Sequence, residues 1–159
     1  MKREGLLLTV ALLLCLPAPA HAQEADQSGN EADIRQVVRD YFDAWGSSSV
    51  EKMKKVLHPR ARLFLGARGT ELVAQTPSQL YANFRSNARH VRGIPQMPEG
   101  SLKIERIDIM GEAAAVKLEV DYPASKVAEQ LSLMKFADGW KIVSRISTVR
   151  LEPARAGLN

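Results

Sequence analysis

The chain has 159 residues, of which 45% are hydrophobic and 25% charged, a balance that excludes an intrinsically disordered protein and fits one folded domain. Its 22 basic and 18 acidic side chains give a formal net charge of +4, a mild excess that favours solubility or an acidic ligand only weakly. A single cysteine excludes a disulfide framework within the chain.

Residues 1–22 have the pattern of a secretory signal peptide. Lys2 and Arg3 precede an apolar run, and Ala20-His21-Ala22 supplies the small residues that precede a cleavage site, so we expect cleavage after Ala22. The run, Leu6–Leu16, has about eleven residues and is shorter than the roughly 20 that span a bilayer. We therefore expect a periplasmic or secreted mature protein with no membrane span. An exported protein rarely meets cellular nucleic acid, so we expect no nucleic-acid partner.

A long helix is predicted near the start of the mature chain, after a flexible leader over residues 23–30. Asn30 is a suitable N-cap for this helix, because its short polar side chain accepts hydrogen bonds from free backbone N–H groups. Apolar side chains then recur at helical spacing and form one continuous stripe. These side chains are Ile34, Val37, Val38, Tyr41, Phe42 and Trp45. Gly46-Ser47-Ser48 is expected to end the helix.

A second, shorter helix and a hairpin are predicted next. Ser48 and Glu51 have the spacing of a capping box, and His58-Pro59 is expected to end the helix. Its inner face is predicted to hold Met53, Val56 and Leu57. The apolar period then changes to two, which predicts short strands over residues 62–65 and 70–75, joined by a glycine-containing turn.

The second half of the chain is predicted to be a third helix followed by four strands. Thr76-Pro77 and Gln79 are typical of a helix start, with a cap, an early proline and a side chain that reaches back. Glycine and proline predict a loop over residues 89–100, and Asp138-Gly139 is typical of a two-residue hairpin turn. The predicted strands are residues 102–110, 113–122, 127–136 and 140–151.

Helices followed by a run of antiparallel strands indicate an α+β fold. We expect the N-terminal helices to pack in the concave face of a curved, mostly antiparallel sheet, because a long sheet with one apolar face twists around what it covers. The folded domain is predicted to span residues 31–151, followed by a loose tail over residues 152–159. The concave side is then either filled by side chains or left with a pocket.

Several segments resemble the nuclear-transport-factor-2-like superfamily, the cone-shaped α+β fold, and within it the lumazine-binding-like family. The segments that carry the resemblance are residues 34–45, Leu57-His58-Pro59, residues 111–116, residues 129–136 and residues 139–143. The superfamily holds isomerases, dehydratases, epoxide hydrolases, polyketide cyclases and many non-catalytic members, so the resemblance implies a fold and no particular activity. The chain departs from the pattern at Arg60 and Glu129, where relatives tend to carry aspartate.

Glu129 is the candidate catalytic residue. It shares one face of its predicted strand with Val127, Leu131 and Leu133, which would turn its carboxylate toward the core. Burial there would raise its pKa and suit it to acid or base chemistry. The resemblance adds that isomerases of this superfamily use a carboxylate in such a pocket. The alternative is a wetted carboxylate at the rim of the sheet, or one paired with an arginine.

Aromatic side chains and one histidine are the candidate lining of a ligand pocket, since large rings line most small-molecule sites and tyrosine adds a hydrogen-bond donor. The alternative for each ring is an ordinary place in the core, and for the histidine a place at a helix end. The candidates are Tyr41, Trp45, His58, Phe64, Tyr81, Tyr122 and Trp140. The sequence offers no cluster of metal ligands and no phosphate-binding loop, so neither a metal nor a cofactor is expected.

Three functions remain open from the sequence. The preferred one is a domain that binds a small, partly apolar molecule without catalysis. The second is a lyase, isomerase or cyclase that uses Glu129. The third is a homodimeric interaction module with a filled interior, in which the outer face of the sheet makes the contact. That face is predicted to carry Gln130, Ser132, Met134 and Phe136.

Overall fold

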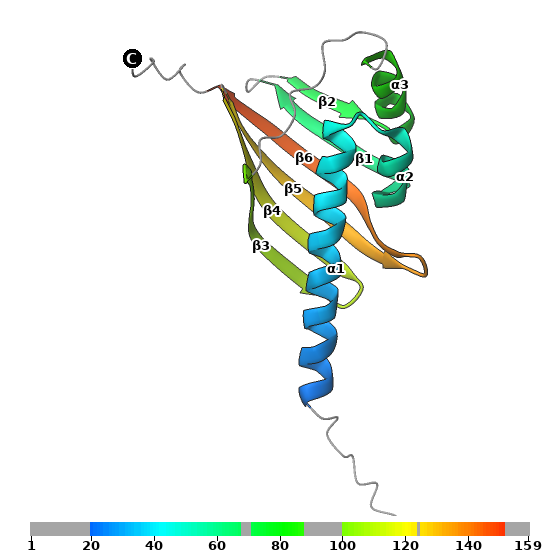
Figure 1. Cartoon of the computed structure of the whole chain (residues 1–159), viewed down its shortest axis with the longest axis vertical. Coiled ribbons are helices and arrows are strands. Elements are labelled where there is room, and N and C mark those ends of the chain that lie inside the picture. The colour runs from blue at the N-terminus through cyan, green and yellow to red at the C-terminus, as the bar shows by residue number, and fades with distance from the viewer. Residues whose placement is uncertain (1–19, 68–70, 88–99, 124, 152–159) are drawn as a thin grey trace, which may run out of the picture.

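The computed structural model describes residues 20–67, 71–87, 100–123 and 125–151 of the chain (Figure 1). The expected signal peptide up to residue 19, the tail over residues 152–159 and the predicted loop up to residue 99 lie outside the described residues. The helices are α1 (Ala20–Gly46), α2 (Val50–Val56) and α3 (Pro77–Asn87). The strands are β1 (Leu57–Ala67), β2 (Glu71–Gln75), β3 (Leu102–Met110), β4 (Ala113–Tyr122), β5 (Ser125–Phe136) and β6 (Gly139–Leu151).

The six strands form one sheet in the order β2-β1-β6-β5-β4-β3. Neighbouring strands are antiparallel, except that β1 and β6 run parallel. The helices lie over one face of the sheet, with α1 crossing the strands and α2 and α3 near β1 (Figure 1). The predicted fold class, α+β with N-terminal helices on a mostly antiparallel sheet, is confirmed.

The core lies between α1 and the face of the sheet that the helices cover. Alternation along β4 and β5 buries every second side chain on that face, while the apolar stripe of α1 is buried against it. The fully buried large side chains include Ile34, Val38, Tyr41, Leu63, Leu118, Leu131, Leu133 and Ile142. The sheet and α1 therefore hold one contiguous core.

Strand β6 contains an irregularity that decides which of its side chains face the core. The register with β5 shifts between Ser132 and Leu133, which pair with Ser144 and Ile142, so Val143 is the extra residue of a bulge. Strict alternation from Ile142 would send Ile146 inward. The bulge reverses the alternation, so Ile146 is 51% exposed and Arg145 is buried.

The start of α1 differs from the prediction. The helix begins at Ala20, so residues 23–30, which we expected to form a flexible leader, are helical. Asn30 is inside the helix and is buried, and its Oδ1 accepts hydrogen bonds from Lys135 Nζ at 2.8 Å and Trp140 Nε1 at 3.4 Å. These contacts with the sheet outweigh the weak helix propensity of asparagine. The prediction of an N-cap at Asn30 is wrong.

The helix caps were predicted with mixed success. Ser49 caps α2 by accepting a hydrogen bond from the backbone N–H of Lys52, whereas Ser48 has a φ of 47° in the turn before it, so the capping box at Ser48 is wrong by one residue. The start of α3 is confirmed. The backbone N–H of Thr76 donates to Gln79 Oε1 at 2.8 Å, and Thr76 Oγ1 accepts from the N–H of Gln79 at 3.3 Å.

Strand β1 begins earlier than predicted. Leu57 is both the C-cap of α2 and the first residue of β1, where it pairs with Ile142, so His58-Pro59 lies inside the strand rather than after a helix. The pairing with β6 resumes only at Arg62, which is where the sequence predicted the strand to start. No helix within the described ranges is long and apolar enough to cross a membrane.

Candidate functional site

A cluster of polar side chains is buried between α1 and the middle of the sheet. Glu129 on β5 and Arg145 on β6 face α1, and their side chains are 6% and 9% exposed. Arg145 Nη1 lies 3.8 Å from Glu129 Oε1. Arg145 is beside Leu63 of β1, and Glu129 is opposite Ser147 of β6, so three adjacent strands position the pair.

Two aromatic residues of α1 complete this cluster. Arg145 Nη1 donates a hydrogen bond to the hydroxyl of Tyr41 at 3.1 Å. The guanidinium carbon of Arg145 lies 5.3 Å from the ring centroid of Trp45, which is a cation–π contact. Tyr41 and Trp45 are four residues apart on the helix, so both reach the same arginine.

Burial shifts the acid–base equilibria in the cluster. The pKa of Glu129 is raised, because loss of solvent disfavours the carboxylate more than Arg145 and the hydroxyl of Ser147 favour it. Burial also raises the pKa of Tyr41, and the charge of Glu129 adds to that effect. Glu129 is therefore buried, as the sequence analysis considered for acid or base chemistry, and it also lies beside an arginine, as the alternative interpretation stated.

The cluster keeps hydrogen-bonding capacity that the described residues do not use. Trp45 Nε1, Glu129 Oε2 and Arg145 Nε are buried and have no hydrogen-bond partner there. Buried polar atoms are usually paired, since an unpaired one loses its interaction with water. The cluster thus presents two N–H donors and one carboxylate acceptor that a bound molecule could engage.

A cavity of about 360 Å³ lies next to this cluster, between α3 and the edge of the sheet formed by β1 and β2. Its walls are mostly apolar, with two amide side chains among them. They are formed by Trp45, Leu63, Leu65, Val73, Gln75, Leu80, Asn83 and Phe84. This size and composition are typical of a small-molecule site.

Trp45 belongs both to the wall of the cavity and to the polar cluster. Its indole forms part of the cavity wall and also contacts the guanidinium of Arg145. The ring of Phe84 packs against it edge-on, with the ring centroids 5.1 Å apart. Glu129 and Arg145 do not line the cavity themselves, and the half-buried indole of Trp45 connects its wall to Arg145.

Of the seven predicted lining residues, Trp45 is the one that lines this cavity. Tyr41 is buried in the core at the polar cluster, and Trp140 is buried with its indole N–H on Asn30. Tyr81 and Tyr122 are half-buried, and burial raises the pKa of both. Their rings pack against the core, as the alternative interpretation of each ring proposed.

The other two predicted lining residues lie away from the cavity. Phe64 is next to the inward-facing Leu63 on β1, so it points to the opposite face of the sheet. His58 stacks on Phe136 with ring centroids 4.9 Å apart, and its Nδ1 accepts a hydrogen bond from the backbone N–H of Arg60. Neither side chain lines the cavity beside Trp45.

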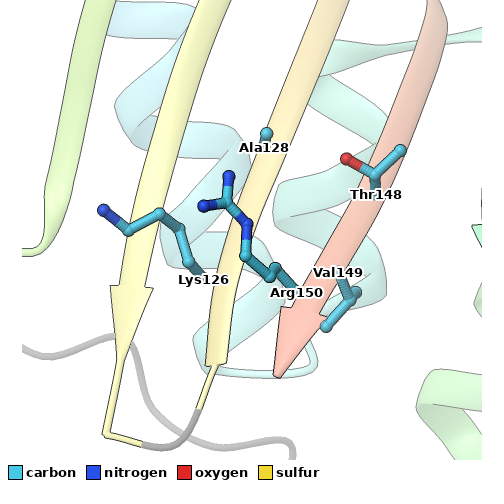
Figure 2. Close-up of a pocket in the computed structure, with 5 residues that line it drawn as sticks. All are labelled: Lys126, Ala128, Thr148, Val149 and Arg150. Atoms are coloured by element: carbon cyan, nitrogen blue, oxygen red, sulfur yellow. The ribbon is translucent and has the colours of Figure 1, made fainter. Parts of the chain in front are cut away.

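The outer face of the sheet carries the side chains that the sequence assigned to it. Met134 and Phe136 are 45% and 37% exposed on β5, and Ile146 is exposed on β6, where it pairs with Gln130 further along the same face. A second hollow, of about 190 Å³, lies at the end of this face and is lined by Lys126, Ala128, Thr148, Val149 and Arg150 (Figure 2). None of its lining side chains is buried, so it lacks the built polar site found beside Trp45.

Arg145 is the functional candidate that the sequence analysis missed. Strict alternation from Trp140 and Ile142 would place it on the outer face, and only the bulge at Val143 turns it inward. One signal pointed to it: an inward-facing Glu129 needs a cationic partner, and the hairpin brings the β6 segment around residue 145 opposite β5.

Among the described residues, no group of three or more potential metal ligands comes together.

Comparisons with known proteins place these features in a family. Residues 29–146 match the model of the family described as "Putative lumazine-binding", which covers more than half of the chain. No curated protein gives a significant sequence match.

Solved structures with the same fold come from several bacteria. An NTF2-like protein of unknown function from Silicibacter pomeroyi is similar with a TM-score of 0.66 at 17% identity, over 78% of this chain and 98% of that one. One from Methylobacillus flagellatus gives 0.61 at 24% identity, over 77% and 93%. A cystatin-like fold protein from Burkholderia xenovorans gives 0.56 at 18%, over 80% and 97%. At these identities the likeness shows the NTF2-like, cystatin-like fold.

Proposed function

The chain belongs to the "Putative lumazine-binding" family, and we propose that it binds a small, partly apolar molecule in the cavity beside Trp45. The observation that carries this proposal is a cavity of about 360 Å³ with apolar walls and a few polar groups. The family description supports a small, ring-containing ligand, and lumazine itself is one compound to test.

The two tryptophans of the chain make this proposal directly measurable. Trp45 lines the cavity, whereas Trp140 lies elsewhere with its indole N–H on Asn30. In a Trp140→Phe variant, Trp45 is the only tryptophan, so its fluorescence reports on the cavity. We expect lumazine or the neutral apolar dye N-phenyl-1-naphthylamine to quench that emission in a saturable way.

The matched control is Trp45→Phe, which keeps Trp140 as the only reporter. Saturable quenching confined to the variant that retains Trp45 places the ligand in the cavity. Equal quenching in both variants, or none by either compound, contradicts binding at this site. Mass spectrometry of the protein purified from its native source would then identify the natural ligand.

Acid–base catalysis by Glu129 is a second candidate, favoured by the buried carboxylate and its raised pKa. Such an enzyme would exchange a proton next to a carbonyl group of its substrate. Deuterium uptake from heavy water by a panel of cyclic ketones, followed by NMR, tests this activity. Exchange that is lost in Glu129→Gln and kept in Glu112→Gln, an exposed glutamate, would support it. Exchange that persists in Glu129→Gln would contradict it.

A homodimer through the outer face of the sheet is a third candidate. Met134, Phe136 and Ile146 expose apolar surface there, and a symmetric contact would cover it in both copies. Sedimentation at micromolar concentration tests this proposal. We expect a dimer for the wild type and a monomer for Met134→Lys, whereas a wild-type monomer would contradict it.

We further propose that the chain is exported and cleaved after Ala22, as its N-terminal pattern indicates. Cleavage there would leave α1 intact from Gln23 onward, with Asn30 and its hydrogen bonds to the sheet retained. N-terminal sequencing of the protein from a periplasmic extract should begin at Gln23. A chain that keeps Met1 in the cytoplasmic fraction would contradict the proposal.

A further inference from the structure

We propose that Glu129, Arg145 and the indole N–H of Trp45 recognise the polar end of the cavity ligand, and that this end is a neutral group with a hydrogen-bond donor beside an acceptor, such as a carboxamide. This inference rests on the proposed binding function and adds the chemical class of the ligand. It is based on the geometry of the buried Glu129–Arg145 pair, on the polar atoms of the cluster that have no hydrogen-bond partner, and on the contacts of Trp45 with both Arg145 and the cavity.

The geometry of the pair is unlike that of a closed structural ion pair. Arg145 Nη1 and Glu129 Oε1 are 3.8 Å apart, whereas charge-assisted hydrogen bonds measure about 2.7–2.9 Å. Both side chains are more than nine-tenths buried, so water does not compensate for the separation as it does at a surface. The described partners of Arg145 are the Tyr41 hydroxyl and the Trp45 ring, and these leave its Nε free.

The free atoms define the chemistry that fits. Glu129 Oε2 accepts, while Arg145 Nε and Trp45 Nε1 donate. A carboxamide offers an N–H for the carboxylate and a C=O for the N–H groups, and so supplies both kinds of partner that these atoms lack. An anionic group would be repelled by Glu129, and a cationic group by Arg145. A neutral group that both donates and accepts is therefore favoured.

The position of Trp45 connects this pair to the cavity. Its indole is part of the cavity wall, and its other contacts are with Arg145 and with the rings of Tyr41 and Phe84. Among the described residues, no hydrogen bond fixes its N–H. The Tyr41 hydroxyl still interacts with this N–H, so turning the indole costs only that one weak polar contact. Such a turn, which the proposal requires, would extend the cavity to the Glu129–Arg145 pair. The apolar body of the ligand would stay between α3 and β1.

Three naphthalene compounds of nearly the same shape test the inference. The three compounds differ only in the substituent on the naphthalene ring. The carboxamide of 2-naphthamide has a hydrogen-bond donor and an acceptor. In 2-acetylnaphthalene a methyl replaces the donor, and in 2-naphthoate the substituent is an anionic carboxylate. At pH 8 we expect the wild type to bind the amide roughly tenfold or more tighter than the ketone, the effect of leaving a charged partner unsatisfied. We expect the carboxylate to bind most weakly.

The Glu129→Gln variant gives a result that misfolding cannot imitate. Removing the negative charge leaves Arg145 without its carboxylate, so 2-naphthoate can take that place. We expect its affinity to rise roughly tenfold or more above that for the wild type, so that it becomes the preferred compound. The matched control, Glu112→Gln, makes the same change at an exposed position and should keep the wild-type order.

The outcomes separate this inference from the binding function on which it rests. If N-phenyl-1-naphthylamine binds the cavity while amide and ketone bind equally to the wild type, the inference is wrong and the binding function stands. The same holds if Glu129→Gln gains no affinity for 2-naphthoate. If neither the dye nor any of the three compounds quenches Trp45, both proposals are overturned.

Discussion

The hydroxyl of Tyr41 offers a direct test of how the buried cluster is held together. Tyr41 is fully buried, and its oxygen accepts the 3.1 Å hydrogen bond from Arg145 Nη1. Tyr41→Phe removes that oxygen, keeps the ring, and leaves a charged donor without its partner. Hydrogen bonds to charged groups contribute about 1.5–3 kcal/mol, so we expect the free energy of unfolding to fall by about 2 kcal/mol.

This loss is large enough for ordinary unfolding experiments. For a domain of this size, about 2 kcal/mol lowers the melting temperature by roughly 5–10 °C. Urea unfolding monitored by circular dichroism would give the free energy directly. Tyr81→Phe is the matched control, because it removes the same atom from a half-buried ring on α3, and we expect it to cost less than about 0.5 kcal/mol. Equal losses in the two variants would refute the role assigned to the Tyr41 hydroxyl.

Three further predictions concern the fold and its charges. Asn30→Ala removes the acceptor of the buried indole N–H of Trp140, and we expect urea unfolding to show a loss of about 1–3 kcal/mol; a neutral effect would mean that this contact does not hold α1 to the sheet. Because folding raises the pKa of Glu129, its carboxylate lowers stability as pH rises from its unfolded value near 4.3. Glu129→Gln lacks this effect, so unfolding at several pH values should show the variant gaining on the wild type above about pH 4; a difference that changes in the opposite direction would mean that the folded pKa is lowered. Ile142→Ala should cost about 2–5 kcal/mol and Ile146→Ala less than about 1 kcal/mol in thermal unfolding, because Ile142 is buried before the bulge and the bulge turns Ile146 outward; similar costs would argue for unbroken alternation.

Most of the fold followed from local patterns in the sequence. Strands β3 and β4 were predicted with their observed bounds, because period-two alternation and a clear turn define both ends. The cap of α3 was also predicted, since Thr76 and Gln79 interact with each other across three residues. The parallel pairing of β1 with β6 was not predicted, because it joins segments whose sequences carry no sign of each other.

The candidate site was predicted only in part, for the same reason. The parity of its strand predicted that Glu129 faces the core, and Trp45 was a lining candidate because it is one of the large aromatic side chains. Arg145 was missed because a single extra residue at Val143 reverses the parity of β6. A bulge of this kind depends on how two strands pair, and nothing in the local pattern of β6 announces it.

The place of β6 in the sheet has a consequence for how the chain folds. β6 is the last strand in the sequence but lies in the middle of the sheet, where it joins β1 to β5. Leu57 pairs with Ile142, so β1 has no neighbour on that side until most of the chain has been synthesised. Closing such a long loop slows folding. A nascent chain would thus stay without its complete sheet until β6 emerges from the ribosome, which would be compatible with the export that we propose.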